Sequence, residues 1–307
     1  MYTQLYDIPL YNTWAHITKI DEGWSKDTKF YIQDKQGEEF LLRISDIKYH
    51  DAKLAEFEII KHINSLDFKM SEALSFGKCN NEQSIFMLLT WVNGKSLDKE
   101  IESLAKEQQY ALGIESGKIL KQLHALPIHS NHLEKVKSKK EMILQRLQCY
   151  ESCDYRVLDD EIAIDFIKEN IDCIEIESPV YTHGDFHVGN LILTPNQHVG
   201  VIDFNRWRYA DPYEEFYKMQ SFDRELSIPF SKGKIDGYFE GNPPDAFWQA
   251  LAVYNAYAAL YSIVWAIPFG KQDIEGMLRR RDLAFEDYEH FKLLIPKWYT
   301  DDSLCQI

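Results

Sequence analysis

Three side chains suited to phosphoryl transfer lie within one short stretch of the sequence. His183-Gly184-Asp185 is followed by Asn190, five residues after the aspartate, and by Asp203, thirteen residues further on. Phosphoryl transfer needs an aligned hydroxyl group, a divalent cation that bridges the phosphates, and oxygen ligands for that cation. Asp185 could accept the proton of an attacking hydroxyl group. Asn190 and Asp203 could supply the oxygen ligands that Mg²⁺ prefers.

The segment between Asn190 and Asp203 gives a reason for their spacing. Two short β-like pieces flank the turn-forming sequence TPNQHVG. A hairpin of this length would bring Asn190 and Asp203 to the same end. The alternative is that Asp185, Asn190 and Asp203 are only turn residues and a helix cap.

The pattern His-Gly-Asp-x₄-Asn followed by Ile202-Asp203-Phe204 strongly resembles the aminoglycoside phosphotransferase and choline kinase family, which shares the protein-kinase fold. The run Asp211-Pro212-x-x-Glu215 also resembles a family element that supports the site structurally. The resemblance implies that Asp185 is the catalytic base and that Asn190 and Asp203 hold Mg²⁺. Neither a GxSxG nor a GxGxxG motif occurs, so a serine hydrolase and a Rossmann enzyme are disfavoured.

The chain changes character after about ninety residues, from strands with one helix to mostly helices. Together with the resemblance, this predicts an α+β, protein-kinase-like fold of two lobes. Residues 1–92 would form a small antiparallel, five-stranded nucleotide-binding lobe with one helix. Residues 93–307 would form a large, mostly helical lobe for catalysis and substrate binding.

The individual elements follow from hydrophobic periodicity and turn signals. Strands are expected at residues 14–21, 28–34, 38–45 and 84–92, with further short pieces at 179–183, 190–193 and 199–204. Helices are expected at 51–66, 106–126, 133–150, 159–174 and 212–219, and from 247 onward. The first helix carries an apolar stripe of Leu54, Phe57, Ile60 and Ile63.

The same resemblance implies where ATP would bind in the small lobe. The loop of residues 21–27, DEGWSKD, would lie over the phosphates, with Ser25 near them. Arg43 would replace the usual lysine as the cation for the α- and β-phosphates, since a guanidinium group can grip phosphate with two hydrogen bonds. Glu56 and Glu58 lie on different faces of the helix, and the family spacing favours Glu56 as the partner of Arg43.

Adenine would meet backbone groups near Thr90 and Val92, in the run LLTWV. Simpler interpretations stay open for this lobe. Residues 21–27 could be an ordinary hairpin loop, Arg43 could lie on the surface of an alternating strand, and LLTWV could be only a buried strand.

Several residues beside the predicted base have more than one interpretation. His183 is expected to be a scaffold for the loop, and His187 either contacts the substrate or is solvated. Asn205 stands where relatives often carry an acidic residue or glycine, which leaves a second metal position open. The cluster Arg206-Trp207-Arg208 could bind an anion or stack on a substrate, although packing is the preferred role for Trp207.

Composition limits the partners of the chain. It is 45% hydrophobic with a net charge of −15, which favours a folded protein and disfavours nucleic acid and anionic membranes as partners. Five cysteines without a CxxC motif, and an N-terminus without a signal-peptide pattern, predict a cytoplasmic protein with reduced thiols. Residues 246–270 are uncharged and long enough to span a membrane, but their polar side chains favour a buried helix.

These observations predict an ATP- and Mg²⁺-dependent kinase of a small molecule, monomeric or homodimeric. The acidic large lobe favours a cationic acceptor such as an aminoglycoside-like polyol. Relatives that phosphorylate choline, homoserine, methylthioribose or amino sugars leave a metabolite kinase as the alternative. A nucleotide-binding pseudokinase scaffold is a further alternative, whereas a protein kinase is disfavoured because HGD replaces HRD.

Overall fold

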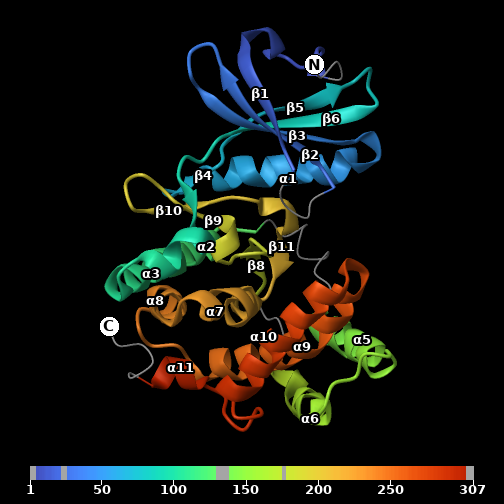
Figure 1. Cartoon of the computed structure of the whole chain (residues 1–307), viewed down its shortest axis with the longest axis vertical. Coiled ribbons are helices and arrows are strands. Elements are labelled where there is room, and N and C mark those ends of the chain that lie inside the picture. The colour runs from blue at the N-terminus through green and yellow to red at the C-terminus, as the bar shows by residue number, and fades with distance from the viewer. Residues whose placement is uncertain (1–4, 22–25, 129–137, 175–177, 302–307) are drawn as a thin grey trace. The chain divides into compact units, whose positions relative to one another are not determined.

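The computed structural model of the chain describes residues 5–21, 26–128, 138–174 and 178–301 (Figure 1). The chain folds into two compact units. The first comprises Met1–Gly94, Thr194–Asn196 and Gly200–Asn205, and the second comprises Lys95–Leu193, Gln197–Val199 and Arg206–Ile307. The first unit thus extends two residues past the predicted boundary at Val92 and takes in two later segments, which the sequence did not reveal.

The first unit is built on an antiparallel sheet with the strand order β1-β2-β3-β6-β5. The strands are β1 (Trp14–Ile20), β2 (Thr28–Asp34), β3 (Glu39–Asp46), β5 (Ala73–Cys79) and β6 (Ser84–Thr90). Four of them lie where the sequence predicts. The position of β5 was not predicted, because Gly77 interrupts its apolar pattern. The structure gives the reason for this glycine: a Cβ atom there would lie 2.9 Å from the ring of Phe86 on the paired strand.

One face of this sheet carries a hydrophobic core, and helix α1 (His50–Ile63) packs near β5 and β6. Alternate residues of β2 point into the core, where Phe30 and Ile32 are fully buried, as expected for a half-buried strand. In α1 the predicted apolar stripe is buried except at Leu54, which is 36% exposed. Leu54 thus belongs to the stripe by its spacing but lies at its exposed edge.

The second unit is mostly helical, so the predicted α+β class is confirmed. Its longer helices are α3 (Lys106–His124), α5 (Lys139–Glu151), α6 (Asp160–Asn170), α8 (Ile228–Phe239), α9 (Asp245–Ala266) and α10 (Lys271–Asp287). Helices α3 and α8 touch backbone to backbone through paired glycines. A Cβ atom at Gly117 of α3 would lie 2.1 Å from the carbonyl oxygen of Lys234 on α8, so only glycine permits this approach.

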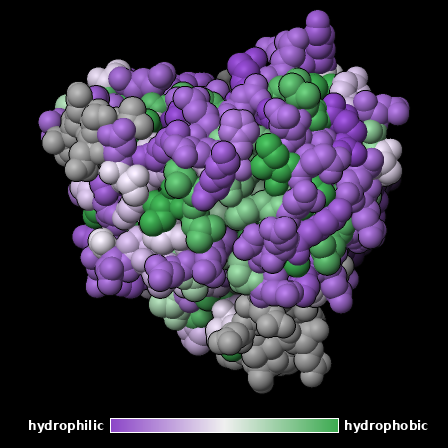
Figure 2. Space-filling model, turned by 90° about the horizontal axis from the view of Figure 1, so that it is seen from below, coloured by the Kyte–Doolittle hydropathy of each residue, from purple (hydrophilic) through white to green (hydrophobic). Residues whose placement is uncertain are grey.

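Helix α9 is the apolar segment that has the length of a membrane span. Together with the short turn after it, it is long and apolar enough to cross a bilayer, but 72% of its most apolar stretch is buried inside the protein. It packs against α5, α6 and α10 in a large hydrophobic cluster. The face of the molecule in Figure 2 is mostly hydrophilic, with hydrophobic side chains in several smaller groups among the hydrophilic ones.

Short strands frame the loop that carries the predicted catalytic residues. In the second unit β8 (Val180–Thr182) pairs antiparallel with β11 (Arg208–Ala210), and β9 (Leu191–Leu193) pairs with β7 (Lys95–Ser96). In the first unit, residues 200–201 of β10 (Val199–Val201) pair in parallel with β4 (Lys69–Met70). The loop from His183 to Asn190 therefore starts from one short strand and ends in another.

Candidate active site

The loop that carries Asp185 is held at its start by a buried carboxylate. Glu215 accepts hydrogen bonds from the backbone N–H groups of His183 (2.6 Å) and Gly184 (2.9 Å). Gly184 has a φ of +78°, and a Cβ atom there would lie 2.1 Å from the carbonyl oxygen of Arg206. Glycine is thus required, and Glu215 gives the predicted Asp-Pro-x-x-Glu element a direct contact with the loop.

The remainder of the loop is fixed by side chains. The backbone N–H of Asp185 donates to Nδ1 of His183 (3.2 Å), a fully buried ring, which agrees with a scaffold role. The backbone N–H of Val188 donates to Asp223 (2.8 Å), whose carboxylate forms a fully buried ion pair with Lys234. The conformation around Asp185 is therefore determined by groups from α8 and from the segment before it.

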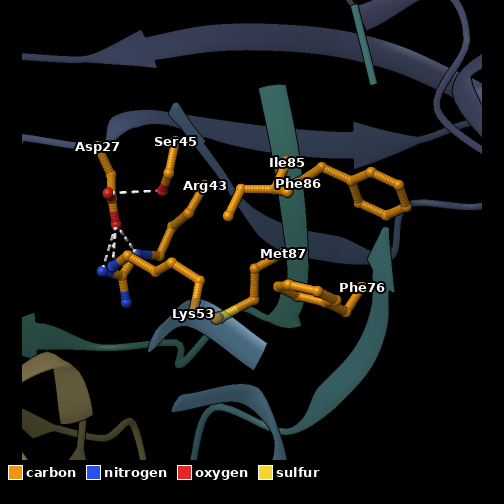
Figure 3. A pocket seen from close by; sticks show the side chains of 8 residues that line it. All are labelled: Asp27, Arg43, Ser45, Lys53, Phe76, Ile85, Phe86 and Met87. Atoms are coloured by element: carbon orange, nitrogen blue, oxygen red, sulfur yellow. Dashed lines mark hydrogen bonds and ion pairs between the residues drawn. The ribbon is translucent and has the colours of Figure 1, made fainter. Parts of the chain in front are cut away.

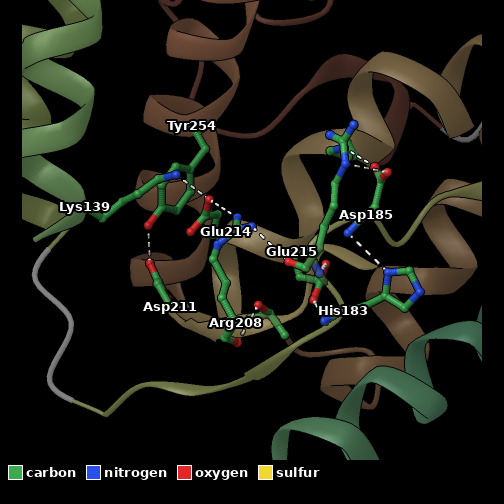
Figure 4. A network of polar contacts seen from close by, with 12 residues as sticks. Lys139, His183, Asp185, Arg208, Asp211, Glu214, Glu215 and Tyr254 are labelled. Carbon is green, nitrogen blue, oxygen red and sulfur yellow. Dashed lines mark hydrogen bonds and ion pairs between the residues drawn. The ribbon is translucent and has the colours of Figure 1, made fainter. Parts of the chain in front are cut away.

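Asp185 itself is surrounded by cationic groups (Figure 4). Lys218 donates a hydrogen bond to its Oδ1 atom, and Nε of Arg206 lies 3.4 Å from its Oδ2 atom. Nε2 of His187 lies 3.4 Å from Oδ1, and the His187 ring stacks on Phe222. Burial raises the pKa of the Asp185 carboxyl group, but His187 and Lys218 lower it well below its usual range. Asp185 is thus an ionised carboxylate that can accept a hydrogen bond.

Asn190, a predicted metal ligand, is oriented by a contact with the loop. Its Nδ2 atom donates to the backbone carbonyl of Asp185 (2.8 Å). This contact directs the amide oxygen elsewhere and leaves that oxygen available to a cation. The contact also couples the predicted ligand to the predicted base within one unit.

Asp203 lies in the first unit, where its Oδ1 atom is 3.9 Å from Nη1 of Arg43. Its φ of +67° is unusual for a residue other than glycine and is frequent at functional sites. Nearby in sequence, the buried Oδ1 atom of Asn205 has no hydrogen-bond partner among the described residues. These oxygen-rich groups fit a hydrated Mg²⁺ ion. That Asn190 and Asp203 share one cation stays a prediction.

Arg43 is buried rather than exposed on an alternating strand, with 3% of its surface accessible. Its Nη1 atom lies 2.5 Å from Oε1 of Glu56, the partner that the sequence favoured, while Glu58 is exposed. Its Nε and Nη2 atoms donate to Oδ2 of Asp27 at 3.0 and 2.5 Å. The guanidinium group is therefore held by two carboxylates.

Three members of this polar cluster, Asp27, Ser45 and Lys53, were missed by sequence reasoning (Figure 3). Lys53 donates to both Asp27 (2.7 Å) and Glu56 (2.8 Å), and Ser45 donates to Asp27 (2.6 Å). The side chains of Asp27, Arg43, Ser45 and Lys53 line one small pocket. Burial raises the pKa of Asp27, yet Arg43, Lys53 and Ser45 together lower it to about 2. A signal was present for Lys53, which precedes Glu56 by one helical turn and so shares its face.

The other predicted nucleotide-binding residues have mixed outcomes. Ser25 lies outside the described residues. The backbone N–H of Thr90 donates to the backbone carbonyl of Glu72 (3.0 Å), and the Thr90 hydroxyl group accepts from the backbone N–H of Glu72 (2.8 Å). Val92 is 5% exposed. The roles of Thr90 and Val92 toward adenine stay predictions.

A second polar network extends from the catalytic loop toward α5 and α9 (Figure 4). Glu214 accepts hydrogen bonds from Arg208 (2.6 Å) and from Lys139. Asp211 accepts from the hydroxyl group of Tyr254 (2.6 Å), and burial raises the pKa of its carboxyl group. Arg208 is therefore compensated by Glu214, whereas Trp207 packs edge-to-face on Tyr209 at 5.7 Å, in line with its predicted packing role.

Comparison with known proteins agrees with this arrangement. A family model described as "phosphotransferase enzyme family" matches residues 16–252 of the chain. No curated protein matches the sequence.

Several solved structures with the same fold are aminoglycoside phosphotransferases. The GDP complex of aminoglycoside 2′-phosphotransferase-IIIa is 14% identical with a TM-score of 0.69, over 92% of this chain and 96% of that one. A ternary complex of an APH(4)-Ia variant with ADP and hygromycin B is 15% identical with a TM-score of 0.68, over 92% and 98%. The gentamicin complex of APH(2″)-IIa is 19% identical with a TM-score of 0.65, over 92% and 94%. The predicted protein-kinase-like fold is thereby confirmed.

Proposed function

The chain belongs to the phosphotransferase enzyme family, and from this premise we propose that it transfers the γ-phosphoryl group of ATP to a hydroxyl group of a small molecule. The observation that carries the proposal is the state of Asp185. It is ionised, fixed through its backbone by His183 and Asn190, and held on a loop anchored by Glu215. A positioned carboxylate of this kind can orient an acceptor hydroxyl group and receive its proton.

Asn190 and Asp203 would hold Mg²⁺, and Arg43 would bind the phosphates of ATP. When bound, Mg²⁺ neutralises charge on the phosphates and helps to align them. The amide oxygen of Asn190, which the contact with Asp185 leaves available, and the position of Arg43, 3.9 Å from Asp203, support these roles. Glu56 would keep the Arg43 guanidinium group in place, since the two side chains are in direct contact. We further propose that the enzyme is cytoplasmic.

For the acceptor we propose a cationic polyol or amine, such as an aminoglycoside-like compound. The net charge of −15 supports this class through long-range attraction. The similar structures solved with hygromycin B and gentamicin support it by analogy.

A specific observation favours a second class of acceptor, one that carries an anionic group. Arg146 pairs with the hydroxyl group of Tyr257 (2.7 Å) and stacks on the ring of Tyr261, so no carboxylate compensates it among the contacts of the described residues. Tyr257 also lies near Lys139, with the ammonium group 5.8 Å from the ring centroid. Lys139 is already paired with Glu214, so the argument rests on Arg146: an acceptor bound beside it would be attracted if it carried a carboxylate or phosphate and repelled if it carried a positive charge.

The test is a substrate panel with Mg·ATP, in which ADP release and the mass of the product are measured. The panel contains aminoglycosides, amino sugars and choline in one set, and hydroxy acids and sugar phosphates in the other. We expect a product heavier by one phosphoryl group with the wild type and none with Asp185→Ala. Binding of Mg·ATP without any product, across both sets and with water, would instead support a nucleotide-binding scaffold.

A further inference from the structure

We propose that Lys218 is a further catalytic residue, whose ammonium group binds the phosphoryl group as it passes from ATP to the acceptor. This inference rests on the proposed function. Lys218 lies just after the short helix Pro212–Phe216, in a position that the sequence patterns did not single out. Its side chain is 11% exposed and reaches Oδ1 of Asp185, the carboxylate to which the acceptor must bind.

The hydrogen-bond capacity of Lys218 is not used up by this contact. An ammonium group has three donors, and a carboxylate can accept about four hydrogen bonds. Within the described part of the chain, Asp185 is the one hydrogen-bond partner of Lys218. Two donors of Lys218 are thus available beside the base, while Asp185 keeps acceptor sites for the hydroxyl group.

The charged groups around Lys218 are also compatible with an anion bound beside it. The charged groups that act on it include Asp185, Arg206 and Glu215. Glu215 accepts hydrogen bonds from the backbone N–H groups of the loop, and Asp185 is the carboxylate in direct contact with Lys218. Nε of Arg206, whose side chain is 43% exposed, adds a second positive charge 3.4 Å from the same Asp185 carboxylate. Donors of a largely buried ammonium group that lack partners are costly, and the oxygen atoms of a bound anion would supply partners for them.

The transferred phosphoryl group is the anion that must come to this place. The acceptor oxygen forms a bond to the γ-phosphorus atom while the bond to the β,γ-bridging oxygen breaks, and that electron pair leaves with ADP. The proton of the hydroxyl group goes to Asp185, and Lys218 keeps its three protons. Negative charge is spread over the equatorial oxygens of the phosphoryl group during transfer. A donor fixed at the base lowers the barrier by stabilising that charge.

A purely structural ion pair is the competing explanation, and variants of the full-length chain separate the two. Lys218→Met removes the charge at similar length, and Lys218→Arg restores a cation. Lys271→Met serves as the control, because it removes one positive charge from a side chain that is 90% exposed on α10. The probes are Mg·ATP hydrolysis with water as the acceptor, and binding of Mg·ADP with and without aluminium fluoride, which imitates the phosphoryl group in transfer.

We expect Lys218→Met to reduce kcat by about 100- to 1,000-fold, the usual effect of losing one charge-stabilising donor. The variant should bind Mg·ADP with the same affinity as the wild type. Aluminium fluoride should raise the affinity of the wild type for Mg·ADP but not that of the variant. Lys218→Arg should recover most of both properties, and Lys271→Met should match the wild type.

Two results would overturn the inference while leaving the proposed function intact. One is a rate for Lys218→Met that equals or exceeds that of the wild type. The other is an unchanged gain from aluminium fluoride together with a lower melting temperature, as a structural role requires. If the wild type itself neither binds nor hydrolyses Mg·ATP, the proposed function fails first.

Discussion

Asp27→Asn is the substitution that most directly tests the charged cluster of the first unit. The Asp27 carboxylate receives hydrogen bonds from Arg43, Lys53 and Ser45 at 2.5 to 3.0 Å, and its side chain is 6% exposed (Figure 3). Asparagine keeps the shape and one acceptor but removes the charge. The cluster then holds two cations against Glu56 alone, so we expect a less stable protein.

The size of the expected loss in the free energy of unfolding follows from the pKa of the Asp27 carboxyl group. Its value falls from an ordinary 3.8 to about 2 in the folded protein. One pKa unit corresponds to about 1.4 kcal/mol, so the charge contributes about 2 kcal/mol to the free energy of unfolding at pH 7. Because the folded-state pKa is the lower one, this contribution is present above the unfolded-state pKa. It is lost as the pH falls from about 4 through 2.

The assay is urea unfolding of the wild type and Asp27→Asn between pH 7 and pH 3. We expect a difference of about 2 kcal/mol that is constant from pH 7 to about 5 and narrows below pH 4. Asp21→Asn is the matched control, because Asp21 makes a similar ion pair with Lys19 but is 77% exposed, and such pairs contribute little. Equal stability of Asp27→Asn and the wild type at pH 7, or a difference that does not change down to pH 3, would refute the reasoning.

Three further predictions concern the rest of the molecule. Gly117→Ala should lower the free energy of unfolding by at least about 2 kcal/mol, because its Cβ atom would lie 2.1 Å from the carbonyl oxygen of Lys234. Gly276→Ala, whose Cβ atom would meet only arginine side-chain ends at 3.8 Å or more, should instead stabilise the protein slightly. Thermal unfolding of both variants measures the two effects. Glu215→Gln should reduce kcat by at least about tenfold, because the neutral amide can accept a hydrogen bond from only one of the two loop N–H groups; an unchanged kcat in steady-state kinetics would argue against the anchoring role. Asp203→Ala should weaken ATP binding only when Mg²⁺ is present, so calorimetric titrations with and without EDTA should differ for the wild type and agree for the variant.

The strands and helices of this protein were largely predictable, because each depends on a pattern within a few residues. The run EEFLLRIS indicates a strand by alternation and apolar content, and β3 occupies Glu39–Asp46. The fifth strand shows the limit of such patterns. Gly77 looks like a break in sequence, and only the ring of Phe86 on the neighbouring strand explains why a strand needs glycine there.

The candidate site likewise has one part that the local sequence could predict and another part that it could not. Asp185 and Asn190 are five residues apart in one loop, so their contact depends on local conformation and could be predicted from the sequence. Helix geometry placed Glu56 and Glu58 on different faces, and the spacing of the family that the chain resembles was needed to choose Glu56.

What only the tertiary structure decided is which charges surround these residues. Lys218 comes from 33 positions after Asp185, and Lys53 comes from 26 positions after Asp27. Nothing in the local sequence distinguishes these lysines from solvated ones, because a charged side chain follows no periodic pattern until packing places it against a buried partner. The sequence therefore predicted the chemistry of Asp185 and its loop, and the packing of distant segments determined the charges that surround this carboxylate.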